Sequence, residues 1–475
     1  MVKMWLIGLF LMTLTHTNAD YSALQAVLSQ KGLQKVTHWL TDWLQNELSS
    51  IVLPKVSGGV NIGIGTVSYV LHDMTIKRCD LPEPSVAFSE GTGVSLEVSG
   101  LSIAISGSWN TNFGIIHDSG WFEMAVYTVT LKTLLQLGMD DERLSISAPV
   151  CSADVGGVQA NFHGGGSFIF QPFVEMFSGR ITNEIRAQIC PAFKNGIEGL
   201  ERHLAAMSVA LKVDPYVYIN ISLTDSPLVE YNGLGLNVTG EFYSINSPSE
   251  PPFSPDSFEL TWQDNYMMSL GASEFCVNSA AYAYHRAGAL QIRIRDDMIP
   301  KASPFHLNTS QLGPLIPQLP KKYPDMPMEL LLYTREAPMI FFNKTLISVQ
   351  LLASAKAFAM KSDTVAIPLF RLDIESSFIA KAYIDKELVK GFLQMKSLTV
   401  KLGATEIGIF SITPIERALK MAMNTFVLPK VNGQLKDGIQ LPFVKGFSPK
   451  NSVMTIENGF VAVAMDISGP SDSRQ

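Results

Sequence analysis

Apolar residues recur at every second position along several stretches of the chain, the pattern of antiparallel strands with one buried face. Glycine-rich turns separate these stretches, so the sequence predicts β structure in both halves. Further strands are expected between Ile347 and Ile409 and over about 459–467. The clearest alternation runs over Val94–Val98, Leu101–Ile105, Phe122–Val126, Val217–Leu223 and Leu290–Ile294.

A helical period of apolar residues appears first over Ser22–Ile51. Its apolar stripe, spaced by three and four residues, is typical of a helix that packs on a sheet; walling a ligand pocket is the alternative. The stripe consists of Leu33, Val36, Leu40, Trp43, Leu44 and Leu48. Further helical segments are expected at Glu175–Leu204, Leu312–Lys322 and Pro414–Phe426.

The ends of the chain and a proline-rich stretch suggest a division into parts. Residues 1–19 resemble a signal peptide: Lys3 precedes the apolar run Met4–Leu14, and Ala19 suits cleavage. Ser247–Pro255 holds four prolines in nine residues, which predicts a stiff linker. We therefore expect a secreted protein with a signal peptide (1–19), an N-terminal domain (20–246), a linker (247–257), a C-terminal domain (258–470) and a tail (471–475).

A short repeat hints that the two halves are alike. The segment Val52–Val56 reads Val-Leu-Pro-Lys-Val, and the same five residues recur at Val427–Val431. Each copy follows a predicted helix, so each is expected at a helix exit. A five-residue match gives only weak support for two similar halves.

Composition and charge limit the possible partners. Hydrophobic residues make up 47% of the chain and charged residues only 17%, so much apolar surface must be buried or filled by a ligand. Residues 20–250 hold 12 Lys and Arg against 23 Asp and Glu, and no Lys or Arg lies between Arg78 and Lys132. This acidic first half does not suit a nucleic-acid partner.

Cysteine content and sequons fit an exported chain. Four cysteines, Cys79, Cys151, Cys190 and Cys276, allow three full pairings, so the core rather than a disulfide framework must carry stability. The glycosylation candidates are Asn220, Asn237, Asn308 and Asn343.

Signatures of catalysis and metal binding are missing from the sequence. No serine has glycine at both −2 and +2, and Gly63-Ile64-Gly65 lacks the third glycine of a dinucleotide loop. No Cys-x-x-Cys occurs, and no two histidines are spaced i, i+4. His163 beside Gly164 is best read as a loop residue. We therefore expect no enzyme, no catalytic residues, no metal and no cofactor, although a triad of distant residues stays open.

Several segments, in order, carry a resemblance to a known family. They are Gln30-Lys31-Gly32-Leu33, Ile105-Ser106-Gly107-Ser108-Trp109, Gly240-Glu241-Phe242-Tyr243, Pro251-Pro252-Phe253, Arg295-Asp296-Asp297-Met298-Ile299-Pro300, Val427-Leu428-Pro429-Lys430-Val431-Asn432 and Leu441-Pro442. As an ordered set over nearly the whole mature chain, they resemble the family of bactericidal/permeability-increasing protein and lipopolysaccharide-binding protein.

The resemblance implies an α+β fold: an elongated boomerang of two similar barrels, each a twisted antiparallel sheet wrapped on helices, joined by a central sheet. It implies that each half has an apolar pocket for phospholipid acyl chains, with Val36, Leu40, Trp43 and Leu44 as candidate wall residues. It also implies a disulfide between Cys151 and Cys190, worth roughly 3–4 kcal/mol for a loop of about 40 residues. Cys79 and Cys276 are then expected as buried thiols, with a bridge between the halves as the alternative.

One segment departs from the family pattern. The bactericidal member carries Lys and Arg at the tip of its first barrel, whereas the matching stretch Ile103–Gly120 has Asp118 as its single charge. Attraction to an anionic bacterial surface is therefore weak at this tip. The second half of the chain has two groups of basic residues, which form either a displaced cationic surface or a solvated outer face. They are Arg293, Arg295, Lys301, Lys390, Lys396 and Lys401.

Two functions follow as hypotheses. The first is a secreted, monomeric protein of innate immunity that binds lipopolysaccharide or related bacterial lipid at a bacterial outer membrane. The second is a phospholipid transfer or carrier protein without bactericidal activity, which acts at lipid particle surfaces. Under both hypotheses, bound phospholipid is the expected ligand of the protein. The two hypotheses differ in the lipid headgroup that the protein accepts.

Overall fold

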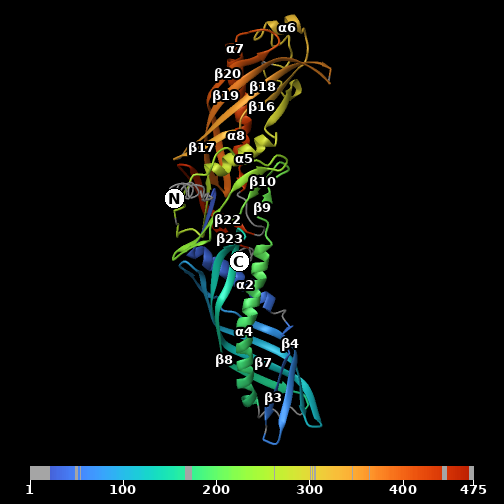
Figure 1. Cartoon of the computed structure of the whole chain (residues 1–475), viewed down its shortest axis with the longest axis vertical. Coiled ribbons are helices and arrows are strands. Elements are labelled where there is room, and N and C mark those ends of the chain that lie inside the picture. Colours follow the sequence, from blue (N-terminus) through green and yellow to red (C-terminus); the bar gives the residue numbers. More distant parts are fainter. Residues whose placement is uncertain are drawn as a thin grey trace, which may run out of the picture.

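The computed structural model describes residues 22–48, 52–53, 55–61, 63–165, 174–261, 263–299, 301, 303, 306–344, 346–362, 364–440 and 447–469. The predicted signal peptide and the tail lie outside these residues. The molecule is elongated and gently curved, with a barrel at each end and a sheet between them (Figure 1). This is the predicted boomerang of mostly antiparallel sheet with few helices.

The first barrel is built on a strongly curled sheet with strand order β2-β4-β6-β7-β8, in which β3 also pairs with β4 and β5 with β6. Its strands are β2 (Val52–Leu53), β3 (Val56–Asn61), β4 (Thr66–Asp80), β5 (Ser85–Ser89), β6 (Gly93–Phe113), β7 (Ile116–Asp140) and β8 (Arg143–His163). The two patterned stretches 94–98 and 101–105 belong to one strand, β6, which continues through register shifts near Leu101. Long bulged strands are what allow a sheet to curl this far.

The helix α4 (Val174–Ala205) runs along the first barrel, at the place where a helix over 175–204 was predicted. Figure 1 shows it lengthwise over the β7 and β8 end of the sheet. Its Ile185 and Ile189 pack on the main core of this barrel. That core includes Leu71, Trp109, Phe122, Val126 and Val158.

The second barrel repeats this architecture with the strand order β15-β16-β18-β19-β20-β21, and β17 pairs with β18. Its strands are β15 (Gln291–Arg295), β16 (Met328–Thr334), β17 (Met339–Asn343), β18 (Leu346–Ser362), β19 (Val365–Asp385), β20 (Leu388–Thr405) and β21 (Ile439–Gln440). Its helices are α6 (Gln318–Lys322), α7 (Thr413–Ala422) and α8 (Leu428–Asp437), with a π-helical turn, η3 (Met423–Val427), between the last two, and a 3₁₀ turn, η2 (Asp296–Met298).

A central sheet joins the barrels with strands from both ends of the chain. Its order is β11 (Leu228–Glu230), β12 (Gly233–Val238), β1 (Leu24–Ser29), β14 (Met268–Ser273), β23 (Phe460–Ser468) and β22 (Ser448–Glu457). A smaller sheet beside it contains β13 (Glu241–Ser244), β10 (Val217–Asn220) and β9 (Ala210–Lys212). Because β1 pairs with both β12 and β14, the centre is shared by the two predicted domains, whose boundaries stay a prediction.

Four sequence-based expectations need correction. The predicted helix 22–51 begins later, because Leu24–Ser29 is strand β1 and the helix α2 is Gln30–Leu48. The predicted strand 217–223 ends at Asn220. The predicted helical stretch 312–322 is helical only in α6. The repeated pentapeptide has no common structure: Val52–Leu53 is strand β2, whereas the second copy lies in η3 and α8 rather than at a helix exit.

Two helices were not predicted: α8, which lies beyond the expected end of the helix 414–426, and α5. The helix α5 (Glu274–Arg286) follows β14 and packs against β13 and β17. Its sequence holds three alanines and two tyrosines but no Leu, Ile or Met, so it lacks the wide apolar stripe that signals a helix. The proline-rich segment before β14 is anchored close by, because the ring of Phe253 packs edge-on against Phe275 of α5 at 5.8 Å between ring centroids.

Candidate lipid-binding site

The helix α2 shows only part of the predicted pocket wall. Leu33 is buried in a cluster with Phe88 and Val94, whereas Val36 leaves 41% of its surface exposed. Val36 is therefore an apolar side chain on α2 that the described core does not cover. The side chains of Leu40, Trp43 and Leu44 lie outside the described residues, so their place in a pocket stays a prediction.

The helix α4 is fastened to the first barrel by a disulfide. Cys151 on β8 is bonded to Cys190 on α4, with 5.8 Å between the two Cα atoms. One turn earlier on the helix, Arg186 lies 2.9 Å from the carboxylate of Asp154 on β8. These links fix the helix over the sheet, so the space beneath α4 has a defined width.

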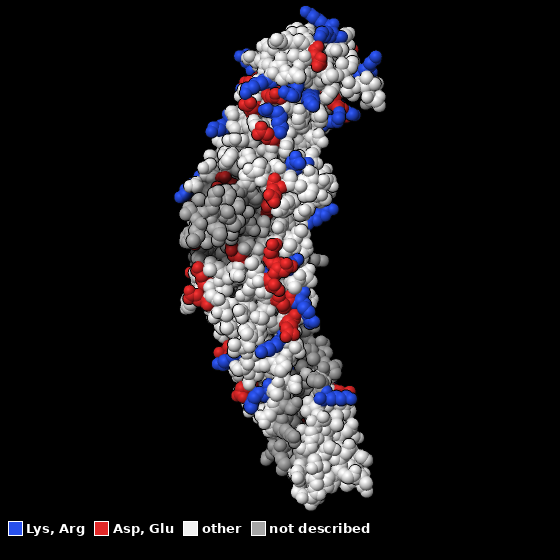
Figure 2. All heavy atoms as spheres, in the orientation of Figure 1, with Lys and Arg blue, Asp and Glu red and all other residues white. Residues whose placement is uncertain are grey.

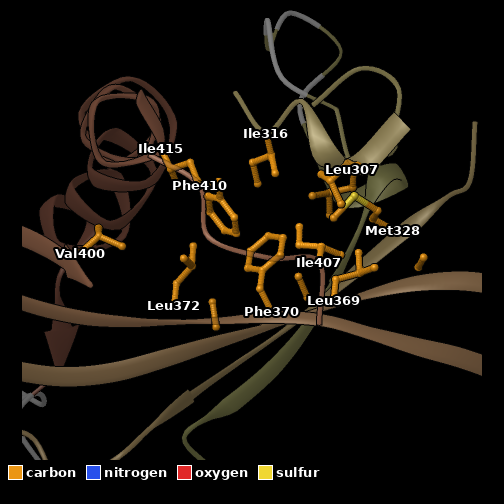
Figure 3. Packing of buried hydrophobic residues seen from close by; sticks show 14 of the residues in the cluster. Leu307, Ile316, Met328, Leu369, Phe370, Leu372, Val400, Ile407, Phe410 and Ile415 are labelled. Atoms are coloured by element: carbon orange, nitrogen blue, oxygen red, sulfur yellow. The ribbon is translucent and has the colours of Figure 1, made fainter. Parts of the chain in front are cut away.

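The inner wall of the second barrel changes character along its length. At the far end, aromatic and aliphatic side chains from the sheet, the loops and α7 point toward one another and fill the interior, as Figure 3 shows for Phe370, Phe410 and Ile415. Nearer the central sheet, the same face of the sheet is apolar but only partly covered. Strand register places these wall residues side by side: Ile347, Val349 and Leu351 on β18, Ala380 on β19, and Leu393 and Met395 on β20.

The end of the wall that is partly covered lies beside the central sheet. Glu387, in the turn between β19 and β20, accepts a hydrogen bond from the hydroxyl of Ser452 on β22. Apolar wall residues that other side chains do not fully cover are what an acyl chain needs. These residues are therefore the candidate lipid-contacting wall, in the half of the second barrel nearest the central sheet.

The helix α8 closes one side of this region by pairing with a strand edge. The Asn432 side chain accepts a hydrogen bond from the Leu393 backbone N–H at 2.7 Å and donates one to its carbonyl at 2.9 Å. These two bonds replace those that a neighbouring strand would make, and so satisfy an otherwise open edge. Nothing in the sequence pattern singles out Asn432, because its partner is the backbone of a strand 39 residues away.

The basic residues of the second half are mostly held in ion pairs. Arg293 and Arg295 on β15 both contact the carboxylate of Glu329 on β16, a residue that is only 1% exposed. The hydrogen bond from Arg295 is the main reason that the pKa of Glu329 is lowered. Lys390 pairs with Asp385, and Lys401 pairs with Glu375. Each partner reduces the field that these cations project, as expected for a solvated outer face.

The remaining candidate residues are spread over the surface and the cores. Cys79 and Cys276 are buried in different clusters, and burial raises the pKa of the Cys276 thiol to about 12. Of the sequon asparagines, Asn343 is exposed at the end of β17. Asn220, Asn237 and Asn308 are partly buried, and the carboxamide of Asn220 already accepts hydrogen bonds from Ser222.

Among the described residues, no three His, Cys, Asp or Glu side chains are grouped as metal ligands. Within the same residues, no helix has both the length and the apolarity to span a bilayer.

Comparison with known proteins covers both halves. Sequence profiles of the LBP / BPI / CETP family match residues 32–200 with the N-terminal domain and residues 211–468 with the C-terminal domain. Bactericidal permeability-increasing protein of Sebastes schlegelii is 32% identical over 443 residues, which cover 93% of this chain and 94% of that protein. Lipopolysaccharide-binding protein of Homo sapiens is 26% identical over 466 residues, with 97% of each chain covered.

A solved structure agrees with the sequence matches. The crystal structure of lipopolysaccharide binding protein superimposes with a TM-score of 0.59 at 25% identity, covering 95% of this chain and all of that one. The agreement spans both barrels and the central sheet. The chain belongs to the LBP / BPI / CETP family.

Proposed function

We propose that the chain is a secreted lipid-binding protein of innate immunity, which holds acyl chains of lipopolysaccharide or related bacterial lipids in the apolar interior of its barrels. The observation that carries the proposal is the partly covered apolar wall of β18, β19 and β20 beside the central sheet. The LBP / BPI / CETP family is a lipid-binding, non-enzymatic family, which supports the same reading.

The energetics of acyl-chain burial suit such a wall. Each buried methylene contributes about 0.8 kcal/mol, so a chain of ordinary length can be held by apolar contact alone. No catalytic group is needed for this, only length and apolar lining. Bound phospholipid is the ligand that we propose for the purified protein.

Export is part of the proposal. The signal-like residues 1–19 and the exposed sequon at Asn343 support it. The Cys151–Cys190 disulfide is typical of proteins from oxidising compartments.

The second candidate is a phospholipid carrier without bactericidal activity. The stretch Ile103–Gly120, at the end of the first barrel, favours it because Asp118 is its single charge. A protein that kills through electrostatic contact with lipopolysaccharide phosphates needs cations at the contact. Lipopolysaccharide binding through acyl chains and phospholipid carriage both remain compatible with an uncharged end.

A wall substitution tests the pocket. Ala380→Trp places a large ring on the inner face of β19, opposite Ile347 and Leu393, whereas Lys381→Trp places the same ring on the outer face. Native mass spectrometry of the purified proteins is expected to show co-purifying lipid in the wild type and Lys381→Trp, and clearly less in Ala380→Trp. Equal lipid content in all three, or none in the wild type, would contradict the pocket.

Titration of labelled lipids separates the two candidates. Lipopolysaccharide and phosphatidylcholine vesicles are compared at low and high salt, since only ionic contacts weaken strongly with salt. Binding of lipopolysaccharide supports the first candidate. Phosphatidylcholine uptake that salt does not change, without lipopolysaccharide binding, supports the second.

A further inference from the structure

Two hairpins end together at the outer end of the first barrel, and each exposes isoleucine. The β3–β4 turn carries Ile64, which is 82% exposed, and the β6–β7 turn carries Ile115, which is 96% exposed, followed by the exposed Ile116. Turns ordinarily hold polar residues, because their side chains face water. Here glycines supply the turn geometry, with a φ of 87° at Gly63 and 58° at Gly114, and isoleucines occupy the outermost positions.

The two hairpin ends form one surface. Strand β4 pairs with β6 up to Ser68 and Asn112, which lie a few residues after the β3–β4 turn and a few residues before the β6–β7 turn. The ring of Phe113 lies so close to Gly65 that a Cβ there would meet it at 2.7 Å. Ile64, Phe113, Ile115 and Ile116 therefore belong to a single apolar tip, which we call the isoleucine tip.

Charge is nearly missing around the isoleucine tip. The segments that build this end of the barrel, 56–76, 103–131 and 155–165, contain no Lys or Arg. Figure 2 shows this end without blue atoms on the face in view. The carboxylate of Asp118 accepts a hydrogen bond from the backbone N–H of Ser119, so the nearest acidic group is engaged in its own loop.

An amphipathic aromatic residue flanks the tip. Trp121 is half exposed on β7, and its ring stacks on His163 of β8 with 3.9 Å between ring centroids. It lies six residues beyond Ile115, roughly 20 Å along the strand at about 3.3 Å per residue. At this distance the ring stays above a membrane that only the isoleucines enter, so the contact surface is the aliphatic tip alone.

The tip is held rigidly from within the barrel. Trp109 is buried, and its indole N–H donates to the carbonyls of Trp121 and His163 at 3.2 Å each. These two hydrogen bonds tie β6 to β7 and β8 below the turn that carries Ile115.

We propose that the isoleucine tip docks the protein on lipid bilayers with net-neutral headgroups by shallow insertion of Ile64, Ile115 and Ile116. The proposal rests on the proposed lipid-binding function and adds the surface and the headgroup class. A bilayer fits because the exposed isoleucines lie at the ends of two neighbouring hairpins and are few, whereas a protein partner needs about 800 Å² of complementary surface on each side. A zwitterionic surface suits a tip without cations, while an anionic one offers it no attraction.

Vesicle co-sedimentation tests the proposal on the full chain. Phosphatidylcholine vesicles are used at about 0.1 M and about 1 M salt, where the Debye length falls from about 10 Å to about 3 Å. We expect wild-type binding to change less than about twofold, because apolar insertion is not screened. We expect Ile115→Asp to lower binding by about tenfold or more, because it removes the burial of a large aliphatic side chain and adds a charge.

The matched control is an isoleucine of similar exposure far from the tip. Ile409, in the second barrel, is 85% exposed, and Ile409→Asp is expected to bind vesicles like the wild type. Ile115→Trp keeps the tip apolar and is expected to bind at least as tightly as the wild type. Thermal unfolding followed by circular dichroism checks that each variant is folded, which is expected for substitutions in exposed positions.

Several outcomes would overturn the proposal. Equal losses of vesicle binding in Ile115→Asp and Ile409→Asp would contradict docking by apolar insertion. Vesicle binding that requires anionic lipid or low salt would contradict it too. A concentration-dependent dimer without vesicles, abolished by Ile115→Asp, would assign the tip to a second copy of the chain instead. Binding of a water-soluble short-chain phosphatidylcholine tests the proposed function separately from the tip. No binding by the wild type would refute the proposed function, whereas binding by Ile115→Asp together with lost vesicle binding supports the tip.

Discussion

Replacing both cysteines of the Cys151–Cys190 disulfide with alanine should weaken the attachment of the helix α4 to the first barrel. The bond closes a loop with a sequence separation of 39 residues. In the chain-entropy model, opening a loop of this size removes about 4 kcal/mol of stability. With a denaturant slope of about 4 kcal/mol per molar in guanidinium, the unfolding midpoint of this barrel should fall by about 1 M.

The same change should loosen α4 locally before the barrel unfolds. Ile185, Ile189 and the Arg186–Asp154 ion pair still hold the helix to the sheet, so its hydrogen exchange should accelerate without reaching the rate of an unfolded chain. Hydrogen exchange with mass spectrometry on peptides from 174–205 measures this directly. The peptides of the second barrel serve as an internal reference, because the two barrels have separate cores.

The matched control is a cysteine variant that breaks no disulfide. Cys79→Ala removes a buried thiol from the same core and should cost about 1 kcal/mol through the small cavity that it leaves. A midpoint shift of less than about 0.3 M in the double variant, or one no larger than that of Cys79→Ala, would contradict this role of the disulfide. Unchanged hydrogen exchange in α4 would contradict it as well.

Two further predictions concern the second barrel. Glu329→Gln should lower stability at pH 7 by about 2 kcal/mol by weakening two charge-assisted hydrogen bonds from Arg293 and Arg295. The pKa of Glu329 in the folded protein is lowered from 4.5, so the wild type keeps this contribution above pH 4.5 and loses it as the pH falls through the lowered pKa. Thermal unfolding between pH 7 and 3 should therefore show a melting temperature that depends less on pH in the variant than in the wild type. Asn432→Ala should cost about 1–3 kcal/mol by leaving the Leu393 backbone groups unpaired, with faster hydrogen exchange at 388–395 and 428–437; unchanged exchange there would contradict the proposed role.

Local patterns predicted the elements of this fold but not their extent. Alternation over Val94–Val98 and over Leu101–Ile105 indicated two strands, because a bulge interrupts the period of two near Leu101. Only the partners on β4 and β7 show that β6 is continuous. The start of the predicted helix 22–51 was wrong for a similar reason. Leu24–Ser29 forms a strand because β12 and β14, more than 200 residues away in the chain, pair with it.

The candidate site was less predictable than the fold. The stripe of α2 was visible from spacing, but the wall of β18, β19 and β20 depends on register between strands, which a single sequence does not reveal. The isoleucine tip did leave a local signal. Ile64 lies between two glycines and Ile115 follows one, so both are large apolar residues in turns that would ordinarily be polar.

Docking and lipid uptake must use different parts of the molecule if both proposals hold. The outer end of the first barrel is filled by Trp109, Phe122 and their neighbours, and the outer end of the second by the cluster around Phe370. Among the described residues, both outer ends are thus packed with side chains, whereas the partly covered wall lies toward the central sheet. Substitutions at the tip should then alter how long the protein stays on a membrane, while substitutions such as Ala380→Trp alter what it carries away.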